Sequence, residues 1–342
     1  MMRVISAVVI ACMIAALGVT AVVPLRADEV ADFYKGRTIT ITAASGVGGG
    51  YGVYAQLIGD HLGKYIPGNP NVIVNFNPAA SGLAAVEHSY NIAPKDGTAA
   101  LAPLQSMPTL QALGMGGGRF DAAKFNWIGR AAETTSGFVV RTQVASSREA
   151  ALAREAETVV GITHPGAPNH ILPALLRFCP GIKMKLVSGY PGSAPIALAF
   201  QRNEVDGVGL PLDSLRTVYP DILKETMVAQ SGLKRARDFP GVPLATELCK
   251  DQGKLKIVEF FQVQEEMGRS YALPPGTPPA RVAALRAAFE AAVKDPALLE
   301  IAKSRKLDIN PLTGTELQKL VERHIGTDAA TVAAAKQAVG LQ

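Results

Sequence analysis

A β-branched run passes directly into a glycine-rich loop and then into a helical pattern between residues 38 and 54. Five of the seven residues from 46 to 52 are glycine. Glycine tolerates positive φ and lets the backbone approach a ligand closely, while the start of a helix offers unpaired N–H groups and a partial positive charge. The order of strand, loop and helix therefore predicts a cradle for an anion. A tight turn without a ligand is the alternative.

The spacing of these glycines excludes the two common nucleotide-binding loops. A G-x-G-x-x-G pattern that starts at Gly46 needs glycine where Tyr51 stands, and one that starts at Gly48 needs glycine where Val53 stands. No Gly-Lys-Ser or Gly-Lys-Thr follows, so a phosphate loop of the nucleotide-hydrolase type is excluded as well.

Residues 1–27 are typical of an export signal. Residues 4–23 are almost wholly apolar after a weakly basic start, and cleavage is expected after Ala27. A retained membrane anchor is the alternative, but small residues dilute the apolar run and no second run follows. Cleavage would leave 342 − 27 = 315 residues with 32 basic and 29 acidic side chains, because Arg3 and Arg26 are lost. This even balance does not indicate a nucleic-acid partner.

The remaining chain alternates β-branched runs with helical patterns, which predicts an α/β fold whose sheets are flanked by helices. The expected strands are residues 38–43, 71–76, 98–104, 158–163, 183–187, 207–210 and 256–263. The expected helices are residues 52–65, 82–92, 147–155, 169–179, 193–203, 278–294, 296–306 and 315–338.

A chain of this length normally divides into two cores. Residues 127–140 and 254–271 are extended runs that we interpret as two crossings between lobes. The first lobe would then comprise residues 28–132 and 264–342, and the second residues 133–263. Cys179 and Cys249 both fall after the export signal, and a disulfide and two free thiols remain open for them.

Three further loops also lie between an expected strand and an expected helix, at residues 77–83, 163–170 and 188–194. Open α/β sheets bind ligands at the carboxyl ends of their strands. Two of the four loops fall in each lobe, so the cleft between the lobes would present N–H donors and hydroxyls from both sides. A small anion, above all a carboxylate, is the expected ligand.

Catalytic interpretations are weaker. His164 and His170 form the only close histidine pair, and their spacing does not favour a shared metal. No G-x-S-x-G, C-x-x-C or H-E-x-x-H pattern is present. Asp206 and Asp213 bracket a short apolar strand and are the candidates for a general base, but a helix-capping role for Asp213 is the simpler interpretation. We therefore expect no enzyme activity, no metal and no cofactor.

Several ordered motifs resemble the extracytoplasmic solute receptors of the tripartite tricarboxylate transporter, the Bug or TctC-like family. The resemblance begins with the glycine loop and continues with a Pro-Ala-x-x-Gly loop from Pro78 and a Pro-x-Asp-Gly-Thr turn from Pro94. Later it includes Tyr-x-Gly from Tyr190, Pro-x-Val-Pro from Pro240, and the Pro-Pro-Gly-Thr-Pro run from Pro274. Together these motifs span nearly the whole mature chain.

The resemblance implies a monomeric periplasmic binding protein whose two α/β lobes, of the type II-like periplasmic binding protein fold, close on a small carboxylated solute in the inter-lobe cleft. It also implies membrane permease subunits as partners and no nucleic acid. In the family the glycine loop and the Pro-Ala-x-x-Gly loop grip a carboxylate. Here Gly52 replaces the family's aspartate, which often meets amine-bearing ligands, and Gln56 replaces an arginine, so a ligand with an amino group is not expected.

The candidate ligand-binding residues come from the four loops and the neighbouring strand ends. They are Ser45, Gly46, Gly48, Gly49, Gly50, Tyr51, Ala80, Ser81, Gly82, Gln105, Ser106, Thr135, His164, Gly166, Asn169, Tyr190, Ser193 and Asp213. The favoured function is solute capture for a permease. A sensor that presents its closed form to a membrane kinase and an exported hydrolase are the alternatives.

Overall fold

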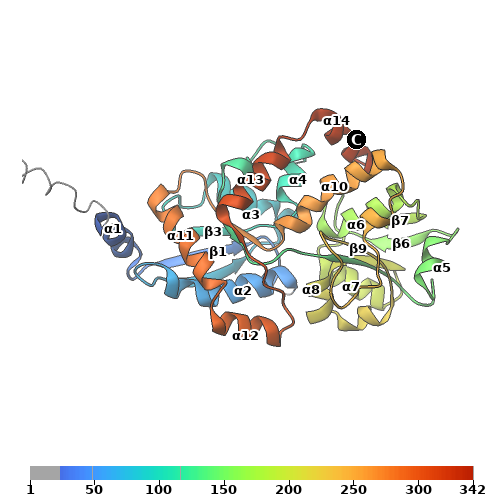
Figure 1. Ribbon diagram of the computed structural model, residues 1–342, viewed down its shortest axis with the longest axis horizontal. Helices are drawn as coiled ribbons and strands as arrows, with labels where there is room; N and C mark the ends of the chain where they lie inside the picture. The colour runs from blue at the N-terminus through green and yellow to red at the C-terminus, as the bar shows by residue number, and fades with distance from the viewer. Residues whose placement is uncertain (1–23, 48, 116, 342) are drawn as a thin grey trace, which may run out of the picture.

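The computed structural model describes residues 24–47, 49–115 and 117–341, which form two α/β lobes side by side (Figure 1). The apolar part of the expected export signal, residues 4–23, lies outside the described residues. The first described helix, α1 (Pro24–Tyr34), continues through the expected cleavage point after Ala27. None of the described helices has the length and apolar character needed to cross a membrane.

The first lobe is built on a six-stranded mixed sheet with the order β11-β4-β10-β3-β1-β2. Its strands are β1 (Thr38–Ala43), β2 (Asn71–Phe76), β3 (Ala99–Ala102), β4 (Asn126–Arg130), β10 (Ser270–Leu273) and β11 (Leu312–Thr313). Strands β2 and β3 run parallel to β1, while β10 is antiparallel to β3 and β4. Parallel strands require crossover helices, which cover both faces of this sheet.

The helices of the first lobe lie on the two faces of its sheet. They are α2 (Gly50–Leu62), α3 (Leu83–Asn91), α4 (Met107–Ala112), α11 (Pro279–Ala292), α12 (Pro296–Ser304) and α13 (Gly314–Ile325). Ile39 and Ile41 of β1 are fully buried in the cluster formed with α2 and α11, whereas Leu101 and Trp127 belong to the cluster on the other face. Alternating side chains of a strand point to opposite faces, so one sheet builds two cores.

The second lobe has a five-stranded mixed sheet with the order β7-β6-β8-β5-β9. Its strands are β5 (Ser136–Val140), β6 (Thr158–Gly161), β7 (Met184–Val187), β8 (Gly207–Pro211) and β9 (Thr226–Ser231). Its helices are α5 (Arg148–Leu152), α6 (Pro168–Phe178), α7 (Ser193–Gln201), α8 (Leu212–Thr217), α9 (Ala245–Leu248) and α10 (Gln252–Met267). The described residues of both lobes also contain four 3₁₀ turns: η1 (Gly63–Tyr65), η2 (Ala79–Gly82), η3 (Ala122–Lys124) and η4 (Pro220–Lys224).

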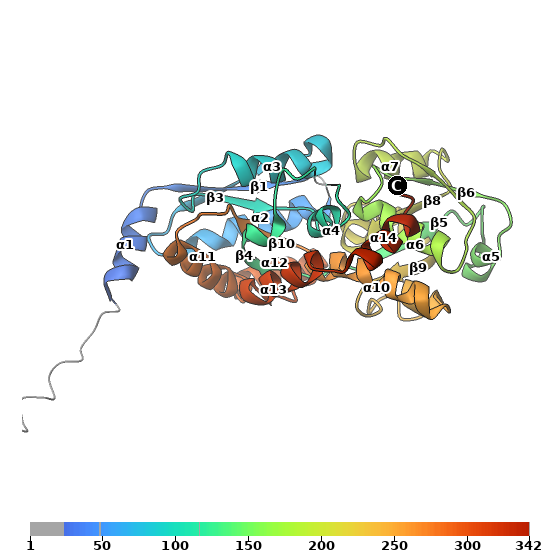
Figure 2. The ribbon, with the colours of Figure 1, turned by 90° about the horizontal axis from the view of Figure 1, so that it is seen from above.

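The predicted fold class, a two-lobed α/β protein with a mixed sheet flanked by helices in each lobe, is confirmed. The chain passes from the first sheet to the second between β4 and β5, and it returns through α10 into β10. The exact lobe boundaries stay a prediction. The last helix, α14 (Ala329–Ala338), was assigned by sequence to the first lobe, but Ala335 and Ala338 pack into a hydrophobic cluster of the second (Figure 2).

The strand expected at residues 256–263 was wrong, and so was the extended crossing at 254–271, because α10 occupies most of both. Asp251 caps this helix by accepting hydrogen bonds from the N–H groups of Gly253 and Lys254. Ile257, Phe261 and Gln264 are buried at helical spacing. The β-branched and aromatic residues here therefore pack one face of a helix and not a strand.

Cys179 and Cys249 form a disulfide with a Cα–Cα distance of 5.2 Å. It ties the end of α6 to the segment after α9, in the second lobe. The question that the sequence left open is therefore answered in favour of pairing.

Candidate functional site

A cavity of about 120 Å³ lies between the lobes where strand ends and helix starts meet. The first lobe contributes the ends of β1 and β2 and the start of α2; the second contributes the starts of α6, α7 and α8. We call this the first cavity. Its described lining residues are Ala44, Ser45, Gly46, Gly49, Gly50, Tyr51, Pro78, Ser81, Leu104, Thr163, His164, Ala167, Pro168, Asn169, Pro191, Gly192, Ser193, Pro211 and Ser214.

The glycines of the first loop serve different purposes. Among the described ones only Gly49 has a positive φ, of 112°. Gly50 and Gly52 are required for space. A Cβ on Gly52 would lie 2.4 Å from the carbonyl oxygen of Val47, because the loop folds back over the first turn of α2. Any side chain at 52, including the family's aspartate, would need a different loop path.

Gly50 allows the lobes to meet. A Cβ at this position would lie 2.8 Å from both carboxylate oxygens of Asp213, which belongs to the other lobe. The N–H of Gly50 donates to the Ser214 hydroxyl over 3.1 Å. The start of α2 therefore contacts the start of α8 directly.

The second loop of the first lobe is a left-handed turn. Ala80, Ser81 and Gly82 have φ values of 49°, 54° and 84°, and a Cβ on Gly82 would lie 2.4 Å from the carbonyl oxygen of Ala44. Two non-glycine residues in this conformation are unfavourable, and such strain concentrates at ligand sites. The turn places Ser81 on the wall of the first cavity.

Three helices of nine or more residues begin at this cavity: α2 at Gly50, α6 at Pro168 and α7 at Ser193. The first N–H groups of a helix have no acceptor within the helix, and each start carries about half a positive charge. The described lining contains no lysine or arginine, and His164 is its only ionisable side chain apart from Tyr51. The positive potential in the first cavity therefore comes chiefly from the backbone.

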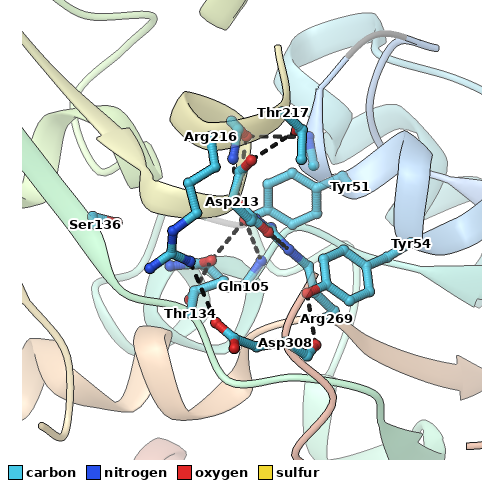
Figure 3. A network of polar contacts seen from close by, with 12 residues as sticks. Tyr51, Tyr54, Gln105, Thr134, Ser136, Asp213, Arg216, Thr217, Arg269 and Asp308 are labelled. Atoms are coloured by element: carbon cyan, nitrogen blue, oxygen red, sulfur yellow. Dashed lines mark hydrogen bonds and ion pairs between the residues drawn. The ribbon is translucent and has the colours of Figure 1, made fainter. Parts of the chain in front are cut away.

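A buried ion pair between Arg269 and Asp213 lies beside the first cavity, and we call it the floor; Figure 3 shows its contacts. The Nε of Arg269 lies 2.9 Å from Oδ2 of Asp213, and the guanidinium stacks 3.9 Å from the Tyr51 ring centroid. Burial raises the pKa of Tyr51 to about 12, so its hydroxyl stays protonated and donates to Gln105 over 2.9 Å. The floor is thus held by hydrogen bonds and carries no net charge.

Glu265 lies behind this floor, where the crossing segments meet. Its carboxylate accepts hydrogen bonds from four donors: Ser231 at 2.5 Å, Thr134 at 2.8 Å, Ser136 at 3.2 Å and the Gln105 amide at 3.2 Å. Burial raises the pKa of Glu265, although these donors act in the opposite direction. This buried carboxylate, held only by neutral donors, joins α10 to the crossing at Thr134, to β5 and β9 of the second sheet and to Gln105 of the first lobe.

The structure brings nine of the predicted site residues to the first cavity. They are Ser45, Gly46, Gly49, Gly50, Tyr51, Ser81, His164, Asn169 and Ser193. Gly48 lies outside the described residues.

The other eight predicted residues do not line the first cavity. Ala80 and Gly82 shape the left-handed turn, Gln105 and Asp213 belong to the polar network, and Ser106 is buried at the start of α4. The remaining three lie elsewhere. Thr135 lines a different cavity, Gly166 packs near Leu110, and Tyr190 packs near Gly161.

Sequence reasoning missed Ser214, Arg269 and Glu265. Ser214 sits beside the predicted Asp213, and a polar pair at the start of an expected helix was the signal that could have found it. Arg269 and Glu265 were hidden because their segment was interpreted as extended.

The candidate general bases are both paired with arginines. Asp206 accepts from Arg141 over 2.7 Å at the start of β8, whereas Asp213 lies beyond the end of that strand and pairs with Arg269. His170 is buried, which lowers its pKa to about 4, and its Nδ1 accepts from the Gly166 N–H. These contacts leave neither acid the free carboxylate that a general base needs. Among the described residues no cluster of three potential ligands could hold a metal ion.

No family model matches the chain, and no curated protein matches it either. Solved structures do. A TctC solute-binding protein from Polaromonas is 20% identical with a TM-score of 0.61, and the match covers 89% of this chain and 99% of that one. The periplasmic binding protein BugD is 18% identical with a TM-score of 0.70, covering 90% and 99%. Rpa4515 of R. palustris, solved with adipate, is 18% identical with a TM-score of 0.69, covering 89% and 97%.

These similarities show that the chain has the fold of TctC and Bug periplasmic binding proteins. The resemblance inferred from the sequence motifs is confirmed at the level of the fold.

Proposed function

We propose that the protein is a periplasmic solute receptor of the TctC/Bug type, which captures a small carboxylate between its lobes and delivers it to a tripartite membrane permease. It acts as a monomer and not as an enzyme. The observation that carries the proposal is the convergence of three helix starts and the Ser81 turn, from both lobes, on one small cavity without a lysine or arginine.

The donors suit a carboxylate. Each oxygen of a carboxylate accepts hydrogen bonds from more than one donor, and helix starts offer N–H groups together with a favourable dipole. Hydroxyls of Ser45, Ser81 and Ser193 lie on the same lining. Solved structures of the same fold support this choice, since one of them was determined with adipate.

The cavity also limits the size and type of the ligand. A cavity of about 120 Å³ suits a small solute. Besides the donors, the lining contains Ala44, Leu104 and several prolines. With Gly52 sterically fixed as glycine, the first turn of α2 supplies no carboxylate to meet an amine, and the nearby Asp213 is already paired with Arg269. A small acid without an amino group fits best.

Capture would proceed by closure of the lobes. The ligand would be gripped by the Gly46–Gly50 loop and Ser81 on one side and by the starts of α6 and α7 on the other. Bending at the two crossings is the expected hinge movement. The closed form would then present a surface from both lobes to the permease.

Isothermal titration against small mono-, di- and tricarboxylates, amino acids and the matching carboxamides tests the proposal. At least one carboxylate should bind saturably and its carboxamide should not. Ser81→Ala should weaken binding by roughly ten- to hundredfold, the value of one hydrogen bond to a charged group, and Gly49→Val should abolish it. Val47→Ala is the matched control, because that side chain is 71% exposed and does not line the cavity. Silence across the panel, or equal binding of acid and amide, would refute the proposal.

A further inference from the structure

A second and larger cavity lies between the same lobes, on the other side of the floor formed by Arg269 and Asp213. Its volume is about 490 Å³. We call it the second cavity. Its lining residues are Tyr54, Glu133, Thr134, Thr135, Asp213, Arg216, Lys234, Arg235, Ala236, Arg237, Asp238, Lys303, Lys306, Leu307, Asp308, Ile309 and Asn310.

The two cavities share no described lining residue, yet only one layer of side chains separates them. On α2, Tyr51 lines the first cavity and Tyr54, one turn later, lines the second. On α8, Ser214 lines the first and Asp213 lines the second. Arg269 fills the layer between, stacked on Tyr51 at 3.9 Å and on Tyr54 at 5.7 Å (Figure 3).

The second cavity is rich in charged side chains, with a positive excess. Six cationic side chains (Arg216, Lys234, Arg235, Arg237, Lys303 and Lys306) face four carboxylates (Glu133, Asp213, Asp238 and Asp308), so the difference is 6 − 4 = +2. Two members of this set are paired with side chains outside the lining, Asp213 with Arg269 and Arg235 with Glu247. These two outside partners have opposite charges, so the excess stays at +2.

The lining cations divide into paired and unpaired groups. Arg216 binds Asp238 and, across the lobes, Asp308; Lys234 binds Glu133 and Arg235 binds Glu247. Within the described part of the chain, Arg237, Lys303 and Lys306 have no carboxylate within 4.0 Å and no side-chain hydrogen bond. Two of these three cations belong to the first lobe and one to the second.

From this arrangement we propose that the second cavity is a binding site for a small multivalent oxyanion, of the polyphosphate or polycarboxylate class, which bridges Arg237 of the second lobe to Lys303 and Lys306 of the first. Separate negative charges are needed because the three cations come from opposite walls. The first cavity, by contrast, offers neutral donors in a small volume, so the two cavities select different ligands.

Occupation of the second cavity would favour the closed arrangement of the lobes. An anion that bridges the two walls would add contacts between the lobes, which the Arg216–Asp308 pair already joins. Any ligand that binds the closed form better shifts the equilibrium toward it, and the coupling between two such sites is reciprocal. The second cavity would thereby act on the affinity of the first.

The test uses the full chain with inorganic pyrophosphate and with citrate as probes, by isothermal titration at constant ionic strength, with acetate as the monovalent reference. The variant Arg237→Gln/Lys303→Gln/Lys306→Gln removes the unpaired cations. The matched control, Lys35→Gln/Lys185→Gln/Arg202→Gln, removes three exposed cations elsewhere. Thermal unfolding without probe verifies that both variants fold.

We expect saturable binding of at least one probe, weakened roughly tenfold by the first variant, the order for three exposed ionic contacts, and unchanged in the control. Gly49→Val, which places a side chain on the wall of the first cavity, should leave this binding intact once thermal unfolding has verified that this variant folds. The probe that binds more tightly identifies a phosphorylated or a polycarboxylate ligand. Equal weakening in both triple variants, loss of binding in Gly49→Val, or no binding beyond that of acetate would each overturn the proposal.

Discussion

The guanidinium of Arg269 and the carboxylate of Asp213 form a buried ion pair that joins the two lobes, with Arg269 Nε 2.9 Å from Asp213 Oδ2. Arg269 directly precedes β10 of the first sheet, and Asp213 lies in the first turn of α8 in the second lobe. Ser214, next to Asp213, accepts from the Gly50 N–H. The hinge region, the start of α2 and the start of α8 are therefore connected through one set of contacts.

Loss of the carboxylate in this pair should destabilise the protein strongly. Asp213→Asn leaves a buried guanidinium without a counter-charge, and we expect the free energy of unfolding to fall by about 3–5 kcal/mol. Asp308→Asn is the control, since Asp308 is 69% exposed in its ion pair with Arg216 and should cost about 1 kcal/mol or less. Urea denaturation measures both. Equal losses would show that the buried pair has no special role.

Substitution of Gly50 should disturb the contact between the lobes. The Cβ of alanine would fall 2.8 Å from both Asp213 carboxylate oxygens, whereas a Cβ on Gly46 has no neighbouring heavy atom within 4 Å. Gly50→Ala should therefore lower the melting temperature and expand the molecule in small-angle scattering. Gly46→Ala, in the same loop, should change neither. A tolerant Gly50→Ala variant would contradict the tight approach described above.

Glu265 should make stability depend on pH. Burial raises its pKa above the ordinary value of 4.5, so the folded protein holds this proton more tightly than the unfolded chain. Its contribution to stability is then greatest below pH 4.5 and falls as the pH rises toward the raised pKa. Glu265→Gln lacks this titration, so its stability relative to the native protein should increase from about pH 4 to about pH 7. A constant difference in urea denaturation across this range would contradict the prediction.

The disulfide should matter for stability and not for ligand binding. Cys179 and Cys249 close a loop with a sequence separation of 70, within the second lobe, and neither lines the first cavity. The chain-entropy estimate for such a loop is about 4 kcal/mol. The variant Cys179→Ser/Cys249→Ser should lose stability of that order in urea denaturation and keep the affinity of the native protein in titration. A change in affinity would link the disulfide to the site.

Local patterns were sufficient to predict much of the first cavity. The order of strand, polar loop and helix at residues 38–54, 77–83, 163–170 and 188–194 indicated four helix starts on two lobes, and all four loops contribute to the lining. Such loops can be predicted from sequence because the local backbone at a helix start itself favours glycine, serine and asparagine.

Contacts between distant segments could not be predicted in this way. Arg269 and Asp213 are 56 positions apart, and nothing in either neighbourhood indicates the other. Residues 256–263 have the composition of a strand, and only the tertiary burial of one helical face selects α10. The need for glycine at two positions also has non-local causes. Gly50 lies against Asp213 of the opposite lobe, and Gly52 lies against the Val47 carbonyl because the loop folds back.

The central claim, that backbone N–H groups of the first cavity hold a carboxylate, is tested most directly by amide NMR. The ¹⁵N-labelled protein would be titrated with the carboxylate that binds best in calorimetry. The account predicts large, saturable shifts of the amide signals of Gly46, Gly49, Ser81 and Ser193, with the same dissociation constant as the heat of binding. Unchanged signals at these four residues, with saturable shifts elsewhere, would contradict it.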